Sequence, residues 1–571
     1  MAISNSDIAA LFRKLADLLD IEGTNPFRIR AYRQAALVID TLPRPVADMV
    51  ANGEDLTQLR GIGKAIAQKI TRIVQTGDFP KLDEVMERTP PVLTDLLQVP
   101  GLGPRKVEQL YETLGVETLS DLEAALRDGR AAALPGFGAK TVANLLAELE
   151  KLKTKGPEKR LPIIDADPIT RLLLTHLNAF PGVIHVQMAG SFRRRKETVG
   201  DLDMVASAEN GSGLIRHFCE FADVKRVELR GITRGTIILK SGLHVDLRVV
   251  NAQSYGTTLA YFTGSRAHTI FLRKMAVKKG WKLSEYGLFD KDQKSLAGPE
   301  EAGLYKAFGR DWIPPELREM HGELEAARHH RLPDLAQQKQ ILGDLHLRRA
   351  DPGLDAQIKA AKALGYGWIG IADPLRSPAC PKAQSPDDLR HQIATIDRLN
   401  AADPDFRILK SAAVEILKDG SLAIKDALLG QLDYVVCRIV TPQGLGEKAQ
   451  TQRLIGAMDQ ATARGARLVI GQLTGRRNNQ APGWQVNFDE IIAAASQHSH
   501  LLEINQDPAL LGLSETQCQR AIEKNVRIAL GSGAAAPADL GRMKYALWQA
   551  RRGWAQAADL ANTRAWDQIF S

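Results

Sequence analysis

Cysteine and long apolar runs are both scarce in this sequence of 571 residues. Its four cysteines lie far apart and form no Cys-x-x-Cys pair, which argues against a zinc ribbon or a disulfide framework and fits a reducing compartment. No run of 18 apolar residues is present, so we expect no membrane-spanning helix. Asp7, Arg13 and Lys14 interrupt the N-terminal segment, where a signal peptide would need an apolar core. We therefore expect a soluble, cytoplasmic protein with no membrane partner.

The net charge of the chain is modestly positive. It carries 75 Lys and Arg against 67 Asp and Glu, which gives +8, and its pI is near 9.1. This charge suits a polyanionic partner such as nucleic acid without proving one. A chain of this length should contain several domains of roughly 100–200 residues each.

The densest charge lies in the stretch GSFRRRKETVGDLD, residues 190–203. The run Leu202–Ala206 predicts a strand, in which Asp201 and Asp203 would point to the same face, about 6.6 Å apart along the backbone. Two such carboxylates can share a pair of Mg²⁺ ions that lie about 3.5–4 Å apart. A lone Asp-x-Asp is more often a surface turn in which Asp offsets Arg. The Gly-Ser pair upstream instead favours a nucleotidyltransferase site.

The start of the same stretch has the chemistry of a phosphate site. Gly190 lets the backbone come close to a phosphate, and Ser191 and Arg194 can bind its oxygens. Further along, residues 235–240 and 244–250 predict a hairpin that turns at Ser241-Gly242. Its alternation places His244, Asp246 and Arg248 on one face, so Asp246 can supply a third carboxylate.

The first 150 residues contain a repeated helix–turn–helix pattern. Apolar spacing predicts helices over residues 7–20 and 29–40. A Gly-x-Gly turn then occurs three times, with intervals of 40 and 35 residues. Its glycines are Gly61 and Gly63, Gly101 and Gly103, and Gly136 and Gly138. Free N–H groups after each turn can hold a phosphate, although a single Gly-x-Gly is often only a helix cap. Three copies resemble helix-hairpin-helix motifs, which bind DNA through phosphates without reading sequence.

Tyr261-Phe262-Thr263-Gly264-Ser265 follows the predicted hairpin. With GSFRRRKETVGDLD and HVDLRVV before it, in that order and behind the Gly-x-Gly repeats, residues 1–318 resemble the family X DNA polymerases. This is the gap-filling repair class that includes polymerase beta.

The resemblance implies a role for each matched residue. Asp201, Asp203 and Asp246 match the carboxylates that hold two Mg²⁺ or Mn²⁺ ions, and Asp246 matches the ligand of the ion that activates the primer 3′-hydroxyl. The matched dNTP-binding residues are Gly190, Ser191, Arg194, Gly200, Tyr261, Phe262, Gly264 and Arg273. Tyr261 and Phe262 match the pair that lies against the sugar and excludes a 2′-hydroxyl; taken without their neighbours, core packing explains them equally well. Gly264-Ser265 matches a cis peptide.

Several positions depart from the family pattern. Thr269 stands where an asparagine usually contacts the incoming base, and Arg195 replaces a common glycine. Lys69 matches the Schiff-base lysine of the 5′-deoxyribose phosphate lyase, with Tyr32 and Arg28 at supporting positions. Most lysines on such helices are simply solvated. Phe27 and Ala65 also differ from the family, so lyase activity is an open expectation.

Beyond residue 339 short apolar segments alternate with helices, which favours a closed α/β barrel. The predicted strands are 368–372, 409–414, 434–436, 468–470, 501–504 and 526–530. This part resembles the polymerase and histidinol phosphatase (PHP) domain, normally a distorted seven-stranded barrel with a trinuclear metal site.

Of the nine PHP ligands, only His346, Asp373 and Glu415 are retained. The other six positions carry Arg348, Pro374, Val440, Gln472, Gly533 and Ala535. Most of these offer no side-chain ligand for a hydrolytic metal, and Arg348 would repel one. We expect the barrel to lack 3′→5′ exonuclease activity and to serve as a structural or DNA-guiding module.

These observations predict a multidomain α+β and α/β protein. The expected parts are residues 1–90 (lyase-like helical), 91–155 (helix-hairpin-helix), 156–260 (nucleotidyltransferase palm), 261–318 (nucleotide selection), 319–339 (linker) and 340–571 (PHP-like barrel). The expected function is template-directed DNA synthesis across short gaps by a monomer that uses dNTPs and binds gapped or primer-template DNA. A DNA-binding scaffold is the rival from another class, but it would not need three aligned carboxylates. An RNA-adding nucleotidyltransferase is disfavoured by the hairpins and by Tyr261-Phe262.

Overall fold

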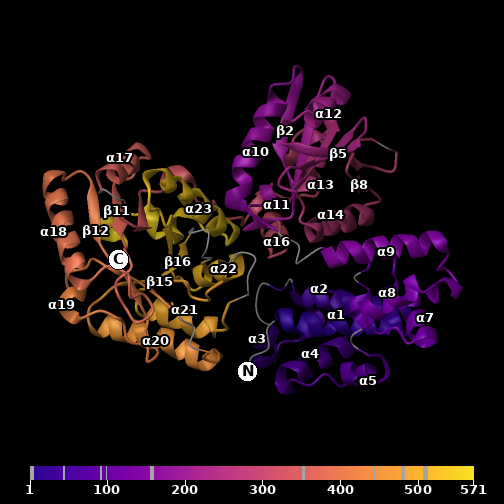
Figure 1. Cartoon of the computed structure of the whole chain (residues 1–571), viewed down its shortest axis with the longest axis horizontal. Helices are drawn as coiled ribbons and strands as arrows, with labels where there is room; N and C mark the ends of the chain where they lie inside the picture. The colour runs from indigo at the N-terminus through magenta and orange to yellow at the C-terminus, as the bar shows by residue number, and fades with distance from the viewer. Residues whose placement is uncertain are drawn as a thin grey trace. The chain divides into compact units, whose positions relative to one another are not determined.

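The computed structural model describes residues 5–40, 42, 46–90, 93–97, 99–154, 160–292, 294–349, 354–440, 444–476, 483–505 and 512–570. The chain folds as two units, residues 1–159 and 160–571 (Figure 1). Among the described residues, no helix has both the length and the apolar character needed to cross a membrane.

The first unit is helical. Its helices are α1 (Asn5–Ile21), α2 (Pro26–Asp40), α3 (Val46–Ala51), α4 (Lys64–Thr76), α5 (Pro80–Arg88), α6 (Leu93–Leu96), α7 (Pro104–Leu114), α8 (Leu119–Arg127) and α9 (Ala139–Thr154). The apolar stripe of α1 lies buried against α2, with Phe12 between Tyr32 and Phe79. Both predicted N-terminal helices are therefore present. Helix α9 continues to Thr154, and the next strong helix breaker in the sequence is Gly156. Residues 155–159 lie outside the described residues.

The second unit begins with a five-stranded mixed sheet in the order β2-β4-β7-β6-β5. Its strands are β2 (Val183–Met188), β4 (Asp201–Ala208), β5 (Val224–Arg230), β6 (Arg234–Leu239) and β7 (His244–Val250). Helices α10 (Ile163–Asn178) and α12 (Gly211–Cys219) and the short strands β1 (Leu161–Pro162) and β3 (Thr198–Val199) complete this region. The predicted β6–β7 hairpin is confirmed.

A small helical subdomain follows the sheet. It contains α13 (Tyr255–Thr263), α14 (Arg266–Lys278), β8 (Lys282–Ser284), β9 (Gly287–Phe289), α15 (Glu301–Ala307) and α16 (Glu323–Arg328). Segment 319–339, expected as a linker, is ordered where it forms α16, and Glu323, Leu324 and Ala327 are buried there. The connection to the C-terminal region is therefore packed rather than exposed.

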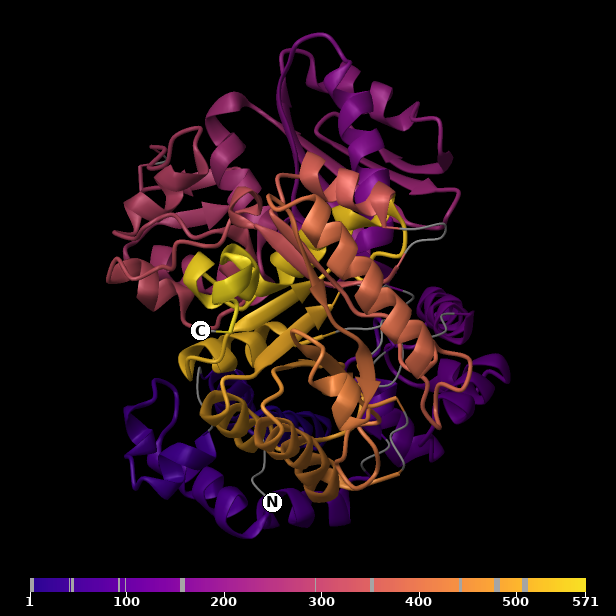
Figure 2. The same ribbon diagram turned by 90° about the vertical axis from the view of Figure 1, so that its left-hand side faces the viewer.

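The C-terminal region alternates strands and helices. Its strands are β10 (Gly343–Leu347), β11 (Trp368–Ile371), β12 (Arg407–Lys410), β13 (Ala413–Glu415), β14 (Val435–Arg438), β15 (Leu468–Gly471), β16 (Leu501–Asn505) and β17 (Ile528–Gly531). The helices are α17 (Asp355–Ala363), α18 (Pro386–Ala402), α19 (Asp426–Leu429), α20 (Glu447–Ala463), α21 (Phe488–Gln497), α22 (Glu515–Glu523) and α23 (Met543–Arg552). Figure 2 shows the strands inside and helices around them. All pairings between these strands are parallel.

The expected single ring of seven strands is not what the described residues form. They form two sheets, β10-β11-β12 and β13-β14-β15-β16-β17. Between β10 and β17 the side chain of Asn562 bridges the strands: its amide donates to the carbonyls of Gly343 and Leu530 at 2.9 Å each. The predicted strand 409–414 is likewise two strands, β12 and β13, which belong to different sheets. The backbone N–H of Lys410 bonds Asp433, where the first strand ends.

Candidate active site

The two predicted acidic motifs meet on neighbouring strands of the mixed sheet. Strand β4 pairs in parallel with β7, with Asp203 opposite Asp246 and Asp201 opposite His244. Because side chains alternate along a strand, Asp201, Asp203 and Asp246 share one face. The intervening Leu202 and Val245 are fully buried on the other face. The register thus brings together three carboxylates from two separate sequence motifs.

The pKa of Asp203 shows how strongly negative charge is crowded here. Burial, reinforced by the charges of Asp201 and Asp246, raises this pKa to about 7 against the opposing effects of Arg194 and Arg234. A side chain at position 190 would collide with the carboxylate of Asp203, and Gly190 has a φ of 57°. Glycine at 190 is therefore required both by the backbone and by the close approach of Asp203.

Two side chains of strand β6 hold Asp246 in place, and the sequence motifs did not reveal these contacts. Asp246 Oδ1 accepts from Thr236 Oγ1 at 2.6 Å and from Arg234 Nη2 at 2.9 Å. Across the described chain, no three His, Cys, Asp or Glu side chains converge on a single point. The carboxylate oxygens nevertheless fit Mg²⁺ or Mn²⁺ by type, and a cation would offset the like charge that raises the pKa of Asp203.

The loop after β2 begins with the short helix α11 (Gly190–Arg193). The hydroxyl of Ser191 is buried and has no hydrogen-bond partner within the described residues. An orphan buried hydroxyl is costly, so it points to a ligand that completes it. Gly200, the last expected phosphate contact, lies just before β4, and an added Cβ there would meet Arg160 at 3.1 Å.

Arg193 and Arg194 connect this loop to the helical subdomain. Arg193 binds Glu301 through two nitrogens, at 2.7 and 2.9 Å. Burial raises the pKa of Glu301, but Arg318 and Arg193 outweigh it and lower the pKa to about 2. Arg194 donates to the carbonyl of Thr263 at 2.6 Å and to Glu319 at 2.9 Å. Glu301 and Glu319 were missed at the sequence level, since nothing in their local pattern reveals such distant partners.

The aromatic pair lies at the end of α13. The rings of Tyr261 and Phe262 meet edge to face with centroids 5.6 Å apart, and Arg248 of β7 lies 5.1 Å from the Phe262 centroid. Arg248 is two residues beyond Asp246, so the pair lies beside the acidic face. The Gly264-Ser265 peptide is cis, as the resemblance implies.

Thr269, the departure from the family's asparagine, is nearly buried. Its hydroxyl donates to the carbonyl of Tyr261 at 3.3 Å. The side chain therefore supports the aromatic pair. Arg273, on the same helix α14, is exposed.

The three Gly-x-Gly turns have one geometry. The first glycine of each has a positive φ: 97° at Gly61, 89° at Gly101 and 83° at Gly136. The second glycines, Gly63, Gly103 and Gly138, do not have a positive φ. A Cβ added at any of them would have no other atom within 4 Å. The fold therefore does not need the second glycine. An outside partner that closely approaches the backbone would explain it.

Lys69 lies on α4, beside the buried Ile66, Ile70 and Ile73. Its amine donates to the carbonyl of Ala65 at 3.3 Å. Partial burial lowers the pKa of Lys69, and the charges of Arg28 and Lys81 lower it further. Tyr32 is buried, whereas Arg28 and Phe27 are exposed.

A cavity of 110 Å³ in the C-terminal region gathers several of the altered ligand positions. It is lined by His346, Arg348, Pro374, Val436, Arg438, Gly471, Gln472, Glu503, Asn505 and Gly533. His346 Nδ1 pairs with Glu503 at 2.5 Å. Asp373 and Glu415 do not line this cavity; they accept backbone N–H groups of Arg349 and Ala379. Glu503 and Asn505 were not predicted, because β16 has the pattern of a plain buried strand.

In this cavity, fixed cations stand where the expected metals would lie. Arg438 is the direct strand neighbour of Glu415, and Arg348 stands in place of a histidine ligand. A guanidinium carries a permanent charge and no lone pair for a metal. The residues present therefore do not fit a trinuclear metal site.

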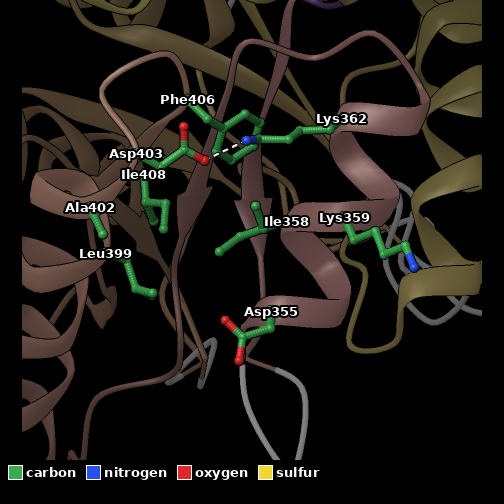
Figure 3. A pocket seen from close by; sticks show the side chains of 9 residues that line it. All are labelled: Asp355, Ile358, Lys359, Lys362, Leu399, Ala402, Asp403, Phe406 and Ile408. Atoms are coloured by element: carbon green, nitrogen blue, oxygen red, sulfur yellow. Dashed lines mark hydrogen bonds and ion pairs between the residues drawn. The ribbon is translucent and has the colours of Figure 1, made fainter.

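A second groove, of 320 Å³, lies between α17 and α18 (Figure 3). Its lining is mostly apolar, with Ile358, Leu399 and Phe406, and Lys362 pairs with Asp403 across it. Because these two charges offset each other, the groove offers no convergent groups for chemistry. The acidic face of β4 and β7 remains the strongest candidate.

Several regions of the chain are similar to known proteins. Family models match a helix-hairpin-helix domain at residues 3–79, a SAM-like helix-hairpin-helix tandem at 93–151 and a DNA polymerase beta thumb at 258–319. The chain is 31% identical to the Bacillus subtilis protein named DNA polymerase/3′-5′ exonuclease PolX, over 98% of this chain and 97% of that protein. It is 27% identical to DNA polymerase lambda of Arabidopsis thaliana, over 55% of this chain and 62% of the relative. It is 24% identical to DNA polymerase lambda of Rattus norvegicus, over 55% of this chain and 56% of that relative.

Proposed function

This chain belongs to the family X DNA polymerases, and from that premise we propose that it fills short DNA gaps during repair by template-directed nucleotidyl transfer from dNTPs. The observation that carries the proposal is the register of β4 and β7. It places Asp203 beside Asp246 and leaves Asp201 on the same face. The orphan hydroxyl of Ser191 on the adjoining loop supports a ligand there.

Polymerases of this family depend on divalent metals, and we assign Asp201, Asp203 and Asp246 as the ligands. Bound Mg²⁺ or Mn²⁺ supplies Lewis-acid stabilisation of the attacking and leaving oxygens. Asp201 and Asp203 would hold both ions, and Asp246 the ion nearest the primer 3′-hydroxyl. Arg234 and Thr236 keep Asp246 oriented toward β6.

The loop and the aromatic pair would bind the nucleotide. Ser191 and Arg194, with the backbone at Gly190 and Gly200, are assigned to the triphosphate, where Arg194 must exchange Glu319 for phosphate oxygens. Tyr261, Phe262 and Gly264 would lie against the sugar and exclude a 2′-hydroxyl, and Arg273 would contact the nascent pair. Thr269 acts through Tyr261 in this assignment.

The test is extension of a primer across a gap of one nucleotide, compared with an open primer-template and with NTPs. We expect the gap to be filled faster than the open template is extended, and dNTPs to be preferred over NTPs. Equal rates of extension on the gapped DNA and on the open primer-template would contradict the gap-filling role. A preference for NTPs would favour the RNA-adding alternative, and no extension at all would favour a scaffold.

The hairpin glycines give a prediction about DNA binding. Gly103→Val together with Gly138→Val should weaken binding at least about tenfold, alike across sequences, since phosphate contacts position the protein without specifying bases. Neither position needs glycine for folding, so circular dichroism should stay unchanged. The measurement is Kd at low salt for two unrelated duplexes. Ala132→Val, an exposed position between the second and third hairpins, is the matched control, and an unaltered Kd in the double variant would contradict the assignment.

Lys69 favours a second activity, removal of 5′-deoxyribose phosphate. A neutral amine is needed to attack the C1′ aldehyde, with loss of water, and the lowered pKa of Lys69 increases its neutral fraction. Borohydride should trap a covalent DNA adduct in the parent protein and about tenfold less in Lys69→Ala. Lys64→Ala on the same helix is the control. An adduct that persists in Lys69→Ala would assign the chemistry to another amine.

The remaining parts of the proposal concern organisation. We propose that the six-part division predicted from the sequence holds, that the protein acts as a monomer in the cytoplasm, and that the C-terminal region is a PHP-type domain without exonuclease activity. The cavity that contains Arg348, Gln472 and Gly533 beside His346 supports the last point.

A further inference from the structure

Helix α23 of the C-terminal region packs against the palm, where Figure 1 shows it beside α10 and α11. Its first turn holds α10: Lys544 and Tyr545 both bind the carboxylate of Asp167. At its end, Arg551 pairs with Glu316 at 2.8 Å. These contacts fix α23 to α10 at its start and to the segment that contains Glu316 at its end.

Arg552, the last residue of α23, reaches into that loop. Its side chain is 1% exposed. One nitrogen, Nη1, donates to the backbone carbonyl of Arg194 at 2.7 Å and to Glu319 at 3.3 Å, and Nη2 donates to Glu515 at 2.8 Å. A buried guanidinium needs such partners, because an unpaired charge in this environment is very unfavourable. The Arg194 carbonyl is therefore fixed in place by a side chain of another domain.

Glu319 contacts both the side chain of Arg194 and Arg552, the residue that binds the Arg194 carbonyl. It accepts from the Arg194 side chain at 2.9 Å and from Arg552 at 3.3 Å. Burial raises the pKa of Glu319, but Arg194, Arg552 and Lys196 outweigh it and lower the pKa below its usual value. When Arg194 turns to a phosphate, Arg552 remains to pair with Glu319.

The next loop residue, Arg195, is also held by α23. Its φ is 59°, in the left-handed region that favours glycine. Its guanidinium lies 3.9 Å from the centroid of the Trp548 ring and 5.5 Å from that of Phe192. Trp548 thus explains how an arginine occupies this position, since the cation–π contact offsets the backbone strain. The end of the loop is held by another part of the C-terminal domain: Arg476, which follows β15, binds Glu197 through two nitrogens, at 2.8 and 3.1 Å.

We propose that Arg552 and Trp548 are positioning residues of the polymerase: the C-terminal domain fixes the conformation of loop 190–197 and so sets the affinity for dNTP. This inference rests on the proposed assignment of Ser191 and Arg194 to the triphosphate. The loop would contact the triphosphate in the ground state and in the transition state alike. Loss of its support should therefore raise KM for dNTP with little change in kcat.

The test uses the full-length protein and steady-state kinetics on a primer-template. Trp548→Ala should raise KM for dNTP about three- to tenfold through loss of the cation–π contact, with kcat and Kd for DNA within about twofold of the parent. Trp548→Phe should restore most of the affinity. Arg542→Ala, which removes an ion pair with Asp539 just before α23 and no contact with the loop or with Trp548, is the matched control and should leave KM unchanged.

Arg195→Gly completes the design, because glycine accepts the positive φ and removes the partner of Trp548. It should raise KM by itself, and Trp548→Ala should then add nothing. If Trp548→Ala proves unstable, Arg195→Gly and Arg552→Lys test the same support. The inference would be overturned if KM for dNTP did not change, or if KM for dNTP and Kd for DNA rose together. Additive increases in KM in the Arg195→Gly/Trp548→Ala double variant would also overturn it. These outcomes are separate from the gap-filling test, since they are measured on a DNA that the parent extends.

Discussion

Alanine in place of Asp201, Asp203 or Asp246 is expected to abolish primer extension while DNA binding persists. Each carboxylate faces the same side of β4 and β7, and bound metals supply several kcal/mol of charge stabilisation. Since about 1.4 kcal/mol is a factor of ten in rate, the loss should reach about a thousandfold. The measurement is single-turnover extension with saturating dNTP and Mg²⁺ or Mn²⁺.

Asp223→Ala is the matched control for these variants, because Asp223 is a half-exposed carboxylate of the same domain. It should extend primers at the parent rate. More than about a tenth of the parent rate in any of the three site variants, with the protein folded, would remove that residue from the metal site.

The second large effect is an absence of activity: the protein should show no 3′→5′ exonuclease. The cavity that would hold hydrolytic metals carries Arg348 and Arg438, and histidine or carboxylate ligands are needed there. The assay offers single-stranded DNA and Mn²⁺ to a protein with Asp201→Ala and Asp203→Ala, so that the polymerase cannot interfere. No shortening above the no-enzyme background is expected.

An exonuclease that survives in this background but disappears with His346→Ala or Glu415→Ala would contradict the prediction. The comparison with the Bacillus subtilis relative, whose name includes a 3′-5′ exonuclease, makes that protein the natural positive control. Restoring Arg348→His alone should not create activity, because Pro374, Val440 and Gln472 would still lack suitable ligands.

The acidic face follows in part from local sequence patterns. A period of two along β4 and β7 is enough to place Asp201 with Asp203, and Asp246 with His244, on one face of each strand. The parallel pairing that brings Asp203 beside Asp246 does not follow from that pattern. Two strands that are distant in sequence must first enter one sheet, and their register depends on tertiary packing.

Two features of the fold were not predicted from the sequence, and each omission has a physical cause. Strand β10 was missed because Asp344 and His346 interrupt its apolar run, yet Asp344 is fully buried and accepts the N–H of Ser532. Burial raises the pKa of Asp344 to about 6. The partners of Arg194 were not predictable for another reason: Glu319 and Arg552 lie in distant parts of the chain, and only folding brings them together.

The hydrogen bond from Arg552 to the Arg194 carbonyl has an evolutionary consequence. A domain that loses its metal ligands is ordinarily free to drift or to be deleted, because selection no longer acts on its chemistry. Here a truncation before α23 would remove Arg552 from Glu319 and Lys544 from Asp167, and with them the support of the Arg194 carbonyl. Selection on DNA synthesis would therefore maintain Arg552, Trp548 and the scaffold that carries them, so that a C-terminal domain without an exonuclease would still be inherited as part of the polymerase.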